Sequence, residues 1–248
     1  MVLLGQKYTS FKSVNCLLAV VISVTFLVTG CVERPKDGKS PEITVYPIPG
    51  DNDAANSYIV SSGGKAAVID AGKPAEIMSK LEKEKLLPIY VILTHGHFDH
   101  IIGLTALKEK YPSLEVFIHA ADQYKPADPV KNLSALFGSR VKTGVQTVPL
   151  SGRSALKIGR VTLEIIETPG HSPGSICIKA GNLLFSGDTL FKGAVVGRTD
   201  FPDSSPEALT ASLKKLLALP DNTVVYPGHG PSTTLGTEKE NIISILDK

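Results

Sequence analysis

Cysteine is scarce in this sequence, with three among 248 residues. Cys16 and Cys31 lie near the N-terminus, so Cys177 is the one thiol in the body of the chain. A single thiol excludes an internal disulfide framework, and the fold must be stabilised by its hydrophobic core. Cys177 lies in "SICIKA", an alternating pattern typical of a strand, and is most simply a small core residue.

An excess of charge of one sign is also missing. The 26 Lys and Arg residues include two lysines in the first 30 positions, and the remaining 24 are balanced by 24 Asp and Glu residues. A neutral body without a basic block argues against a nucleic-acid partner. The sequence has no internal repeat and no low-complexity tract, which leaves a globular domain.

The N-terminal apolar run is too short for a typical membrane span. Leu17–Val28 is interrupted only by Ser23 and Thr25, whereas a bilayer span needs about 20 apolar residues. Two preceding lysines, a short apolar run and small residues before "LVTGC" are typical of an export signal. We therefore expect a signal peptide over residues 1–30, with an uncleaved signal anchor as the alternative.

"LVTGC" resembles the lipobox of bacterial lipoproteins, whose cysteine becomes lipidated and forms the mature N-terminus. The resemblance implies a membrane-anchored lipoprotein of the bacterial cell envelope, facing outside the cytoplasm, with acyl chains on Cys31. Two or more chains hold a protein at a membrane far better than one. Residues 31–42 are polar and contain two Pro and one Gly, so we expect a flexible linker there.

From residue 43 onward, strand and helix patterns alternate. Strands are predicted over residues 57–62, 65–70, 89–93, 115–119, 155–158, 161–167, 175–180, 183–188 and 224–226. Helices are predicted from Pro74, through Leu104 and Leu107, and from Pro206 with Ser205 as its cap. Residues 122–144 are predicted to be irregular. The pattern indicates one α/β domain over residues 43–248, with helices on the outer faces of its sheets.

A dense polar cluster follows the apolar strand at 89–93. "THGHFDH" places His95, His97, Asp99 and His100 within six positions. Chance is one explanation, but crowded imidazoles and carboxylates are costly to bury unless a cation lies among them. In an extended segment, alternate side chains point the same way, so His95 and His97 can reach one ion.

Three further segments each place a His or Asp beside glycine just after a strand: "TPGHSPGS" (His171), "LLFSGDTLF" (Asp188) and "VYPGHGP" (His229). These segments and "THGHFDH" hold five of the six histidines, and we interpret the sixth, His119, as structural. Loops at strand ends tend to converge on one rim of a sheet. Five imidazoles and two or three carboxylates exceed the needs of one tetrahedral zinc and suit two ions about 3.5–4 Å apart.

These four segments together resemble the metallo-β-lactamase superfamily, and most closely its short hydroxyacylglutathione-hydrolase (glyoxalase II-like) members. The resemblance implies a single-domain αββα sandwich with the metals at one edge. By position, it implies a first metal held by His95, His97 and His171, a second held by Asp99, His100 and His229, and Asp188 bridging them. Asp70 and Asn56 match positions near the site, although both could equally be turn residues at strand ends.

The resemblance also implies the chemistry. We expect two divalent metal ions, with Zn the first choice and Fe or Mn open. The expected reaction is hydrolysis of a small-molecule acyl thioester by a hydroxide that bridges the metals, with Asp99 orienting that nucleophile. No Ser or Cys nucleophile has a motif here.

Departures from the family pattern narrow the substrate. The commonest zinc β-lactamases have Cys where Asp188 stands, which argues against β-lactams as the main substrate. Glutathione-hydrolysing members have a Gly-Lys-aromatic-Tyr stretch where this chain has "GRTD". Arg198 could grip a substrate carboxylate or pair with Asp200, which replaces the tyrosine. We also expect the C-terminal helical region that holds glutathione to be absent, so glutathione recognition stays open.

Three rival interpretations remain. Persulfide dioxygenases share this fold and "GRTDF" but use a single iron. A lactonase or promiscuous β-lactamase is the second rival. An inactive metal-binding or sensor lipoprotein is the third, and seven intact ligand positions argue against it.

Overall fold

The computed structural model describes residues 42–152, 154–193 and 195–246. The predicted signal peptide, Cys31 and nearly all of the predicted linker lie outside the described residues. In the part of the chain that is described, no helix combines the length and apolar character needed to cross a membrane.

Six strands form a first sheet in the order β1-β2-β3-β4-β5-β6. They are β1 (Thr44–Ile48), β2 (Ser57–Ser62), β3 (Lys65–Ile69), β4 (Leu87–Ile92), β5 (Glu115–His119) and β6 (Val148–Leu150). Strands β1 to β3 pair antiparallel, and β3 to β6 pair parallel. The β2–β3 hairpin turns at Gly63-Gly64, as predicted, with φ of 59° and 76° at the two glycines.

Six more strands form a second sheet in the order β12-β11-β10-β9-β8-β7. They are β7 (Ala155–Ile158), β8 (Val161–Glu167), β9 (Ile176–Ala180), β10 (Leu183–Gly187), β11 (Val224–Pro227) and β12 (Thr233–Thr234). Strand β9 is antiparallel to both β8 and β10, and β11 is parallel to β10. Strands β8, β10 and β11 therefore run the same way, and their carboxyl ends reach the same edge.

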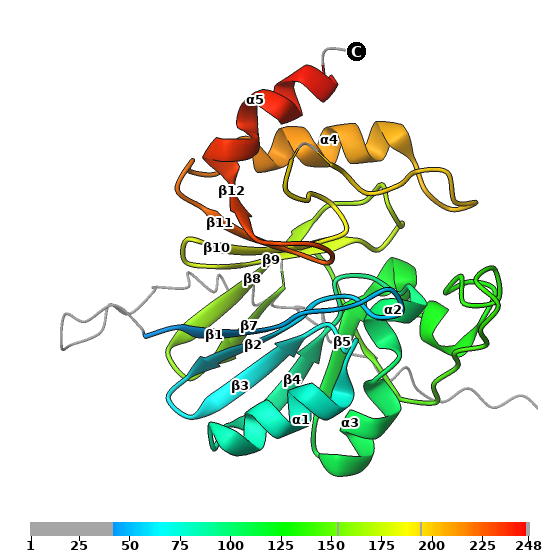
Figure 1. Cartoon of the computed structure of the whole chain (residues 1–248), viewed down its shortest axis with the longest axis vertical. Coiled ribbons are helices and arrows are strands. Elements are labelled where there is room, and N and C mark those ends of the chain that lie inside the picture. The colour runs from blue at the N-terminus through cyan, green and yellow to red at the C-terminus, as the bar shows by residue number, and fades with distance from the viewer. Residues whose placement is uncertain (1–41, 153, 194, 247–248) are drawn as a thin grey trace, which may run out of the picture. The chain divides into compact units, whose positions relative to one another are not determined.

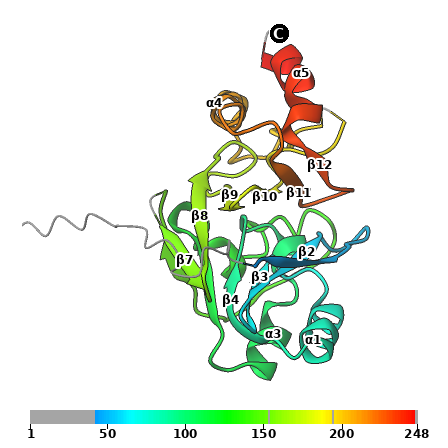
Figure 2. The ribbon, with the colours of Figure 1, turned by 90° about the vertical axis from the view of Figure 1, so that its left-hand side faces the viewer.

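Helices cover the outer faces of the two sheets (Figures 1 and 2). They are α1 (Pro74–Lys83), α2 (Phe98–Ile101), α3 (Leu104–Lys110), α4 (Pro206–Leu216) and α5 (Leu235–Leu246), with 3₁₀ turns η1 (Ala120–Asp122) and η2 (Lys125–Ala127). Helices α1 and α3 pack on the first sheet, and α4 and α5 pack on the second (Figure 1). This αββα arrangement confirms the predicted fold class.

Three apolar clusters hold these layers together, because alternate residues of each strand face opposite sides. On β2, Ile59 packs towards α1, whereas Tyr58 and Val60 pack between the sheets. On β9, Cys177 faces α4 and is fully buried. Burial raises the pKa of its thiol to about 11, which keeps the thiol protonated and unreactive at neutral pH, as expected of a core residue.

Local signals mark the start of α4, the helix between β10 and β11. The Ser205 hydroxyl accepts a hydrogen bond from the Ala208 backbone N–H (3.1 Å), and Pro206 begins α4. Helix α5 was not predicted, because its polar start in "GTEKEN" obscures the apolar face. Short strands such as β6 and β12 were also missed, since two or three residues carry no alternation to detect.

Candidate metal centre

The first sheet contributes four predicted ligands, all in the segment that follows β4. His95 lies in a bend after β4, His97 has an extended backbone just before α2, and His100 lies inside that helix. All three imidazoles are buried. Because α2 begins at Phe98, the chain turns between His97 and Asp99, and the two halves of the motif face different parts of the site.

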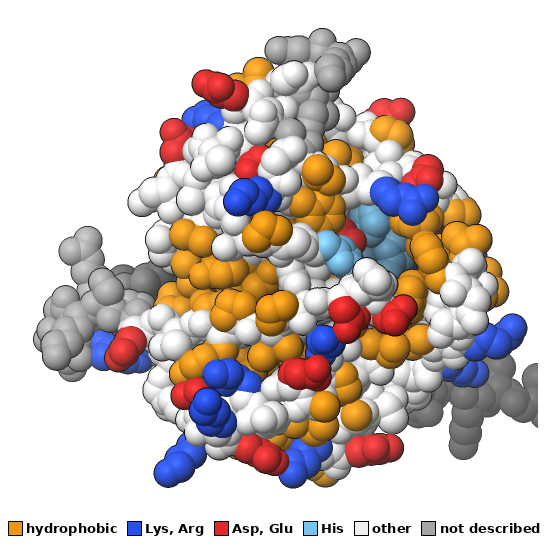
Figure 3. Space-filling model, viewed as in Figure 1, with side chains coloured by type: hydrophobic (Ala, Val, Ile, Leu, Met, Phe, Trp, Pro, Cys, Tyr) orange, Lys and Arg blue, Asp and Glu red, His pale blue; other side chains and the backbone are white. Residues whose placement is uncertain are grey.

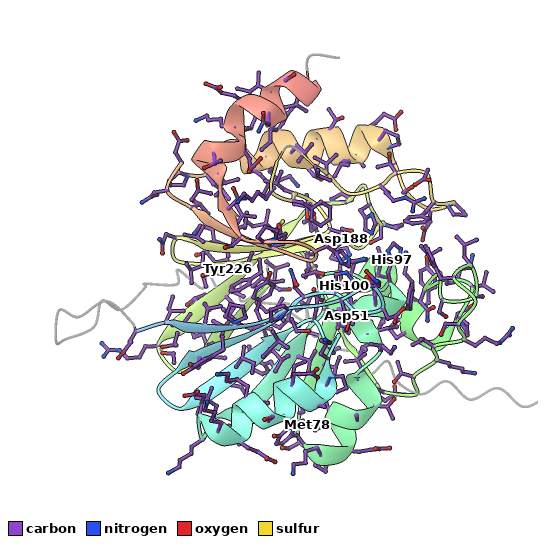
Figure 4. The ribbon with its side chains drawn as sticks, in the orientation of Figure 1. Asp51, Met78, His97, His100, Asp188 and Tyr226 are labelled. Atoms are coloured by element: carbon purple, nitrogen blue, oxygen red, sulfur yellow. The ribbon has the colours of Figure 1, made fainter. Side chains whose placement is uncertain are left out.

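The second sheet contributes three side chains from the edge where its parallel strand ends meet. His171 follows β8, Asp188 directly follows β10, and His229 follows β11. Figure 4 shows His97, His100 and Asp188 close together where the two sheets meet. All seven predicted ligand residues therefore converge at one edge of the sandwich.

The donor atoms form three overlapping groups. Each group brings its atoms within 4.8 Å of one another: His95, His97 and His171; His95, His100 and Asp188; Asp99, His100 and His229. The first and third groups match the two ligand sets that the family resemblance implies. Asp188 lies between them, with Oδ1 3.3 Å from His100 Nε2 and Oδ2 3.5 Å from His171 Nε2.

Unpartnered atoms show that these residues fit a metal. Among the described residues, five buried side-chain nitrogen or oxygen atoms lack a hydrogen-bond partner, and four belong to this cluster. They are His95 Nε2, His97 Nε2, His100 Nε2 and Asp188 Oδ1. Unsatisfied buried polar atoms are costly, and a bound cation would satisfy all four.

The charges of His95, His97 and Asp188 suit metal ligation. Burial, together with neighbouring imidazoles, lowers the pKa values of His95 and His97 well below their ordinary range, which keeps both rings neutral. Burial alone would raise the pKa of Asp188, but His100, His171 and His229 outweigh it and hold that pKa well down. Neutral imidazole and ionised carboxylate are the forms that bind metals. Burial alone would lower the pKa values of His100 and His229, but neighbouring carboxylates outweigh it and raise both, so these two rings must lose a proton before they bind a metal.

Asp70 holds His100 in place. Its Oδ2 lies 2.9 Å from His100 Nδ1 and accepts from the Thr94 hydroxyl, while its Oδ1 accepts from the Thr94 N–H, both at 2.8 Å. Asp70 has a left-handed backbone, φ 58°, which aspartate tolerates in turns. It is therefore a strand-end turn residue that also orients a predicted ligand, leaving His100 Nε2 free to face the site.

Asn56 holds the loop that carries His229. Its side-chain N–H groups donate to the carbonyl oxygens of Pro227 (3.0 Å) and Gly230 (2.9 Å), on either side of the histidine. Its Oδ1 accepts from the Gly50 N–H at 2.8 Å. Asn56 thus ties the start of β2 to the last motif and fixes where His229 projects.

Glycine is required where the backbone passes the carboxylate. A Cβ atom at Gly228 would collide with Asp188 Oδ1 and lie 2.9 Å from His100 Cε1. Gly187 has φ 48°, and a Cβ there would lie 2.6 Å from the Thr94 side chain. The glycines of the motifs therefore allow strand ends from both sheets to approach closely.

Asp122 is a site residue that the sequence analysis missed. Its fully buried carboxylate accepts hydrogen bonds from the N–H groups of Gly96 and Gly174, each at 2.9 Å, and from the Ser172 hydroxyl at 2.7 Å. Gly96 separates His95 from His97, and Ser172 follows His171. Asp122 thus joins the two loops that carry the first group of donors.

A buried lysine accompanies this carboxylate. Lys125 is fully buried, and its Nζ lies 3.6 Å from Asp122 Oδ1 and 2.7 Å from Asp203 Oδ2. The positive charge compensates for Asp122 inside the protein. No sequence signal marked either residue, because both lie in the segment predicted to be irregular, where Asp122 ends η1 and Lys125 begins η2.

Arg198 pairs with Asp200, which is one of the two roles that the sequence allowed for it. Its Nε and Nη2 donate to the two Asp200 oxygens at 2.9 and 2.7 Å. The guanidinium lies 4.7 Å from the centre of the Phe201 ring. Arg198 borders the cavity beside the cluster, so gripping a substrate carboxylate would require it to leave Asp200.

This pairing gives a testable expectation. We expect Arg198→Ala to change KM for an anionic thioester by at most about fivefold, because the exposed guanidinium is already paired with both Asp200 oxygens. Asp200→Ala, which frees the guanidinium, should lower KM for the same substrate. Steady-state kinetics with anionic and neutral thioesters would check both. A large rise in KM for Arg198→Ala on the anionic substrate alone would show that Arg198 binds it directly.

His119 lies apart from the cluster. Its Nε2 is 3.0 Å from Glu167 Oε1, and its Nδ1 accepts from the Ala121 N–H at 3.2 Å. The bond from His119 lowers the pKa of Glu167. These contacts join β5 to β8, which fits a structural role.

The family described as the metallo-beta-lactamase superfamily matches residues 50–229. The match covers well over half of the chain and all seven residues of the cluster. The chain belongs to the metallo-β-lactamase superfamily. Membership of this superfamily and the His/Asp cluster together indicate that the protein binds metal and belongs to a metallo-hydrolase family.

Two relatives within the superfamily carry informative names. "Probable metallo-hydrolase YqgX" of Bacillus subtilis is 37% identical over 196 residues, which cover 75% of this chain and 90% of that protein. A hydroxyacylglutathione hydrolase of Xanthomonas oryzae pv. oryzae is 34% identical over 171 residues, covering 69% of this chain and 58% of that protein. The glyoxalase II-like likeness therefore rests on a partial match.

Two solved structures of the superfamily are similar over nearly their whole length. The crystal structure of BLEG-1 B3 metallo-beta-lactamase has a TM-score of 0.74 and 35% identity, covering 79% of this chain and 97% of that one. The crystal structure of TTHA1623 in a di-iron-bound form has a TM-score of 0.71 and 36% identity, covering 79% and 98%.

Proposed function

We propose that this protein is a dinuclear metal-dependent hydrolase of small-molecule acyl thioesters. In this proposal His95, His97 and His171 hold one divalent ion, Asp99, His100 and His229 hold the other, and Asp188 bridges them. The hydrolase names among its relatives support the reaction class. Zinc is the first choice of metal, and the di-iron form of TTHA1623 keeps iron open.

The observation that favours a thioester is the absence of an ordinary proton donor from the cavity beside the cluster. Besides the proposed ligands, its described polar lining residues are Asn52 and Arg198. The Arg198 guanidinium gives up no proton, since pairing with Asp200 raises its pKa further. Apart from the proton that Asp99 would take from the attacking water, a leaving group therefore meets no side-chain acid in the described lining. A thiolate, whose parent thiol has a pKa of about 8.5, departs without a proton far more readily than an alkoxide or amide.

The two ions, when bound, would lower the pKa of a water molecule towards neutrality and polarise the substrate carbonyl. The chain's own residues position the reactants. Asp99 borders the cavity, with Oδ2 3.1 Å from His229 Nε2, and is placed to orient the attacking water and accept its proton. The buried Asp70 keeps the His100 ring from rotating, and the buried Asp122 holds the loops that carry His97 and His171.

A β-lactam is the second candidate substrate. The structural similarity to BLEG-1 B3 metallo-beta-lactamase favours it. A lactone or a persulfide is a further alternative for the same cluster. The amine released from a β-lactam needs a proton or a metal contact as it leaves, and among the described lining residues outside the histidines only Asp99, with the proton taken from water, could supply the proton.

A substrate panel tests the proposal. Full-length protein loaded with Zn, Fe or Mn would be assayed on thioesters, including lactoylglutathione, and on lactones, β-lactams and a persulfide. We expect turnover of thioesters, with weak binding of the glutathione part. Lactone hydrolysis without thioester turnover would replace the assignment with lactonase. Oxygen consumption on the persulfide with one iron per chain would replace it with an oxygenase.

We also propose that Cys31 anchors the protein to a membrane of the bacterial cell envelope. We expect Cys31→Ser to release the protein into the soluble fraction or to leave an uncleaved precursor, because the acyl chains have no other attachment point. Cell fractionation and the mass of the mature chain would check this. Cys177→Ser is the matched control and should leave partitioning unchanged. Unchanged partitioning and mass for Cys31→Ser would contradict the lipobox interpretation.

A further inference from the structure

The cavity beside the metal cluster has two apolar walls. It has a volume of about 310 Å³, within the range of small-molecule sites. Phe98, Leu133 and Phe137 form one wall, and Phe191, Val195 and Phe201 belong to the segment opposite. Figure 3 shows histidine side chains in a hollow with hydrophobic side chains on both sides. The donors therefore lie at the base of an apolar slot.

One wall is built on a strained residue. Leu133 has φ 69°, a left-handed conformation that is costly for a side chain branched like leucine. The surrounding turn holds it there: the Phe98 N–H donates to the Asn132 carbonyl at 3.0 Å, and the Asn132 amide donates to the Val141 carbonyl at 2.8 Å. The Leu133 side chain thereby lines the cavity that the cluster also borders. Such strain tends to persist at ligand sites.

Apolar side chains at the mouth of the slot are left in water. Phe137 and Val195 are each 55% exposed. The Phe137 ring lies 5.5 Å from that of Phe98, which continues the wall from the mouth to the cluster. Large apolar surfaces facing water beside a reactive site are typical of a ligand-binding groove.

We propose that this slot binds an apolar chain next to the scissile bond of the substrate. The inference rests on the proposed function and names its substrate class: neutral alkyl or aryl thioesters rather than thioesters of charged, peptide-like thiols. Leu133 and Phe137 determine this specificity. Arg198 is the one Lys or Arg among the described lining residues, and it is held by Asp200, so it is not free to bind an anionic tail.

A chain-length series tests the inference. Acetyl to hexanoyl thioesters of N-acetylcysteamine vary the acyl side, and acetyl thioesters of ethanethiol to hexanethiol vary the thiol side. For one of the two series we expect kcat/KM to rise about fourfold per added methylene, the gain from burying it. Phe137→Ala should lower kcat/KM for the longest substrate about fivefold and flatten that series.

Leu136→Ala is the matched control. Leu136 is 69% exposed, neighbours Phe137 in the chain, and is not among the lining residues. In Leu136→Ala, kcat/KM should rise with chain length as steeply as in the wild type. The comparison also corrects for any loss of the longer substrates into the detergent used to keep the protein in solution. If kcat/KM rose with chain length equally steeply in Phe137→Ala and the wild type, the inference would be overturned.

A binding measurement separates this inference from the proposed function. Calorimetric titration of the metal-loaded, full-length protein with butyrate, hexanoate and octanoate should give a Kd that falls with chain length, and Phe137→Ala should weaken that trend. If no thioester is turned over but this trend appears, the thioesterase proposal fails and the apolar slot stands. If thioesters are turned over, but kcat/KM does not change with acyl or thiol chain length and Kd does not change with carboxylate chain length, the proposed apolar slot is wrong and the thioesterase proposal stands.

Discussion

Asp188→Asn is expected to reduce the metal content of the purified protein to one ion per chain or fewer. The same change should lower thioester hydrolysis by at least about 100-fold, beyond the 10–100-fold typical of losing an outer hydrogen-bond partner. Among the described residues, Asp188 is the one carboxylate in contact with both donor groups, reaching His100 with Oδ1 and His171 with Oδ2. Asparagine keeps the shape but loses the charge that two nearby cations require.

Elemental analysis of the purified variant, with assays at saturating metal, would measure both effects. His119→Ala is the matched control, because this histidine contacts Glu167 and lies apart from the cluster. It should retain metal and activity. Full metal content in Asp188→Asn would show that this carboxylate does not bridge two ions.

Asp122→Asn is expected to weaken metal binding by about 10–100-fold without removing a ligand. It is also expected to lower the free energy of unfolding by about 3 kcal/mol, because a buried hydrogen-bonded network is broken. The carboxylate accepts from Gly96, Ser172 and Gly174 with both of its oxygens. The NH₂ group of an asparagine would face a donor at one of these positions, and the loops that carry His97 and His171 would separate.

Metal affinity measured well below the unfolding temperature distinguishes this positioning role from a loss of stability alone. Asp203→Asn is the control, since Asp203 contacts the same lysine but is partly exposed and holds no ligand loop. We expect it to reduce stability slightly and to leave metal affinity close to that of the wild type. Equal metal affinity in Asp122→Asn and the wild type would limit Asp122 to a structural role.

The sequence predicts the parts of the site that repeat a local pattern. Each ligand segment couples a strand signal to glycine and a His or Asp, and the strand directions bring those ends to one edge. Helix α4 was predictable in the same way, because Ser205 and Pro206 mark its start. These features depend on neighbours a few residues away, which a single sequence records.

Features that depend on distant partners were not predictable. Asp122 meets its hydrogen-bond donors 26, 50 and 52 positions away, and no periodicity marks the turns around it. Leu133 became informative only through its left-handed backbone. The choice between the two roles of Arg198 needed the distance to Asp200. Tertiary contacts decide such residues, and local propensity does not reveal them.

We expect seven side chains of this chain to hold two metal ions. Anomalous diffraction from crystals of the metal-loaded protein tests this expectation most directly. We expect two peaks about 3.5–4 Å apart, one among His95, His97 and His171 and the other among Asp99, His100 and His229, with Asp188 between them. A single peak, or peaks away from these residues, would contradict it.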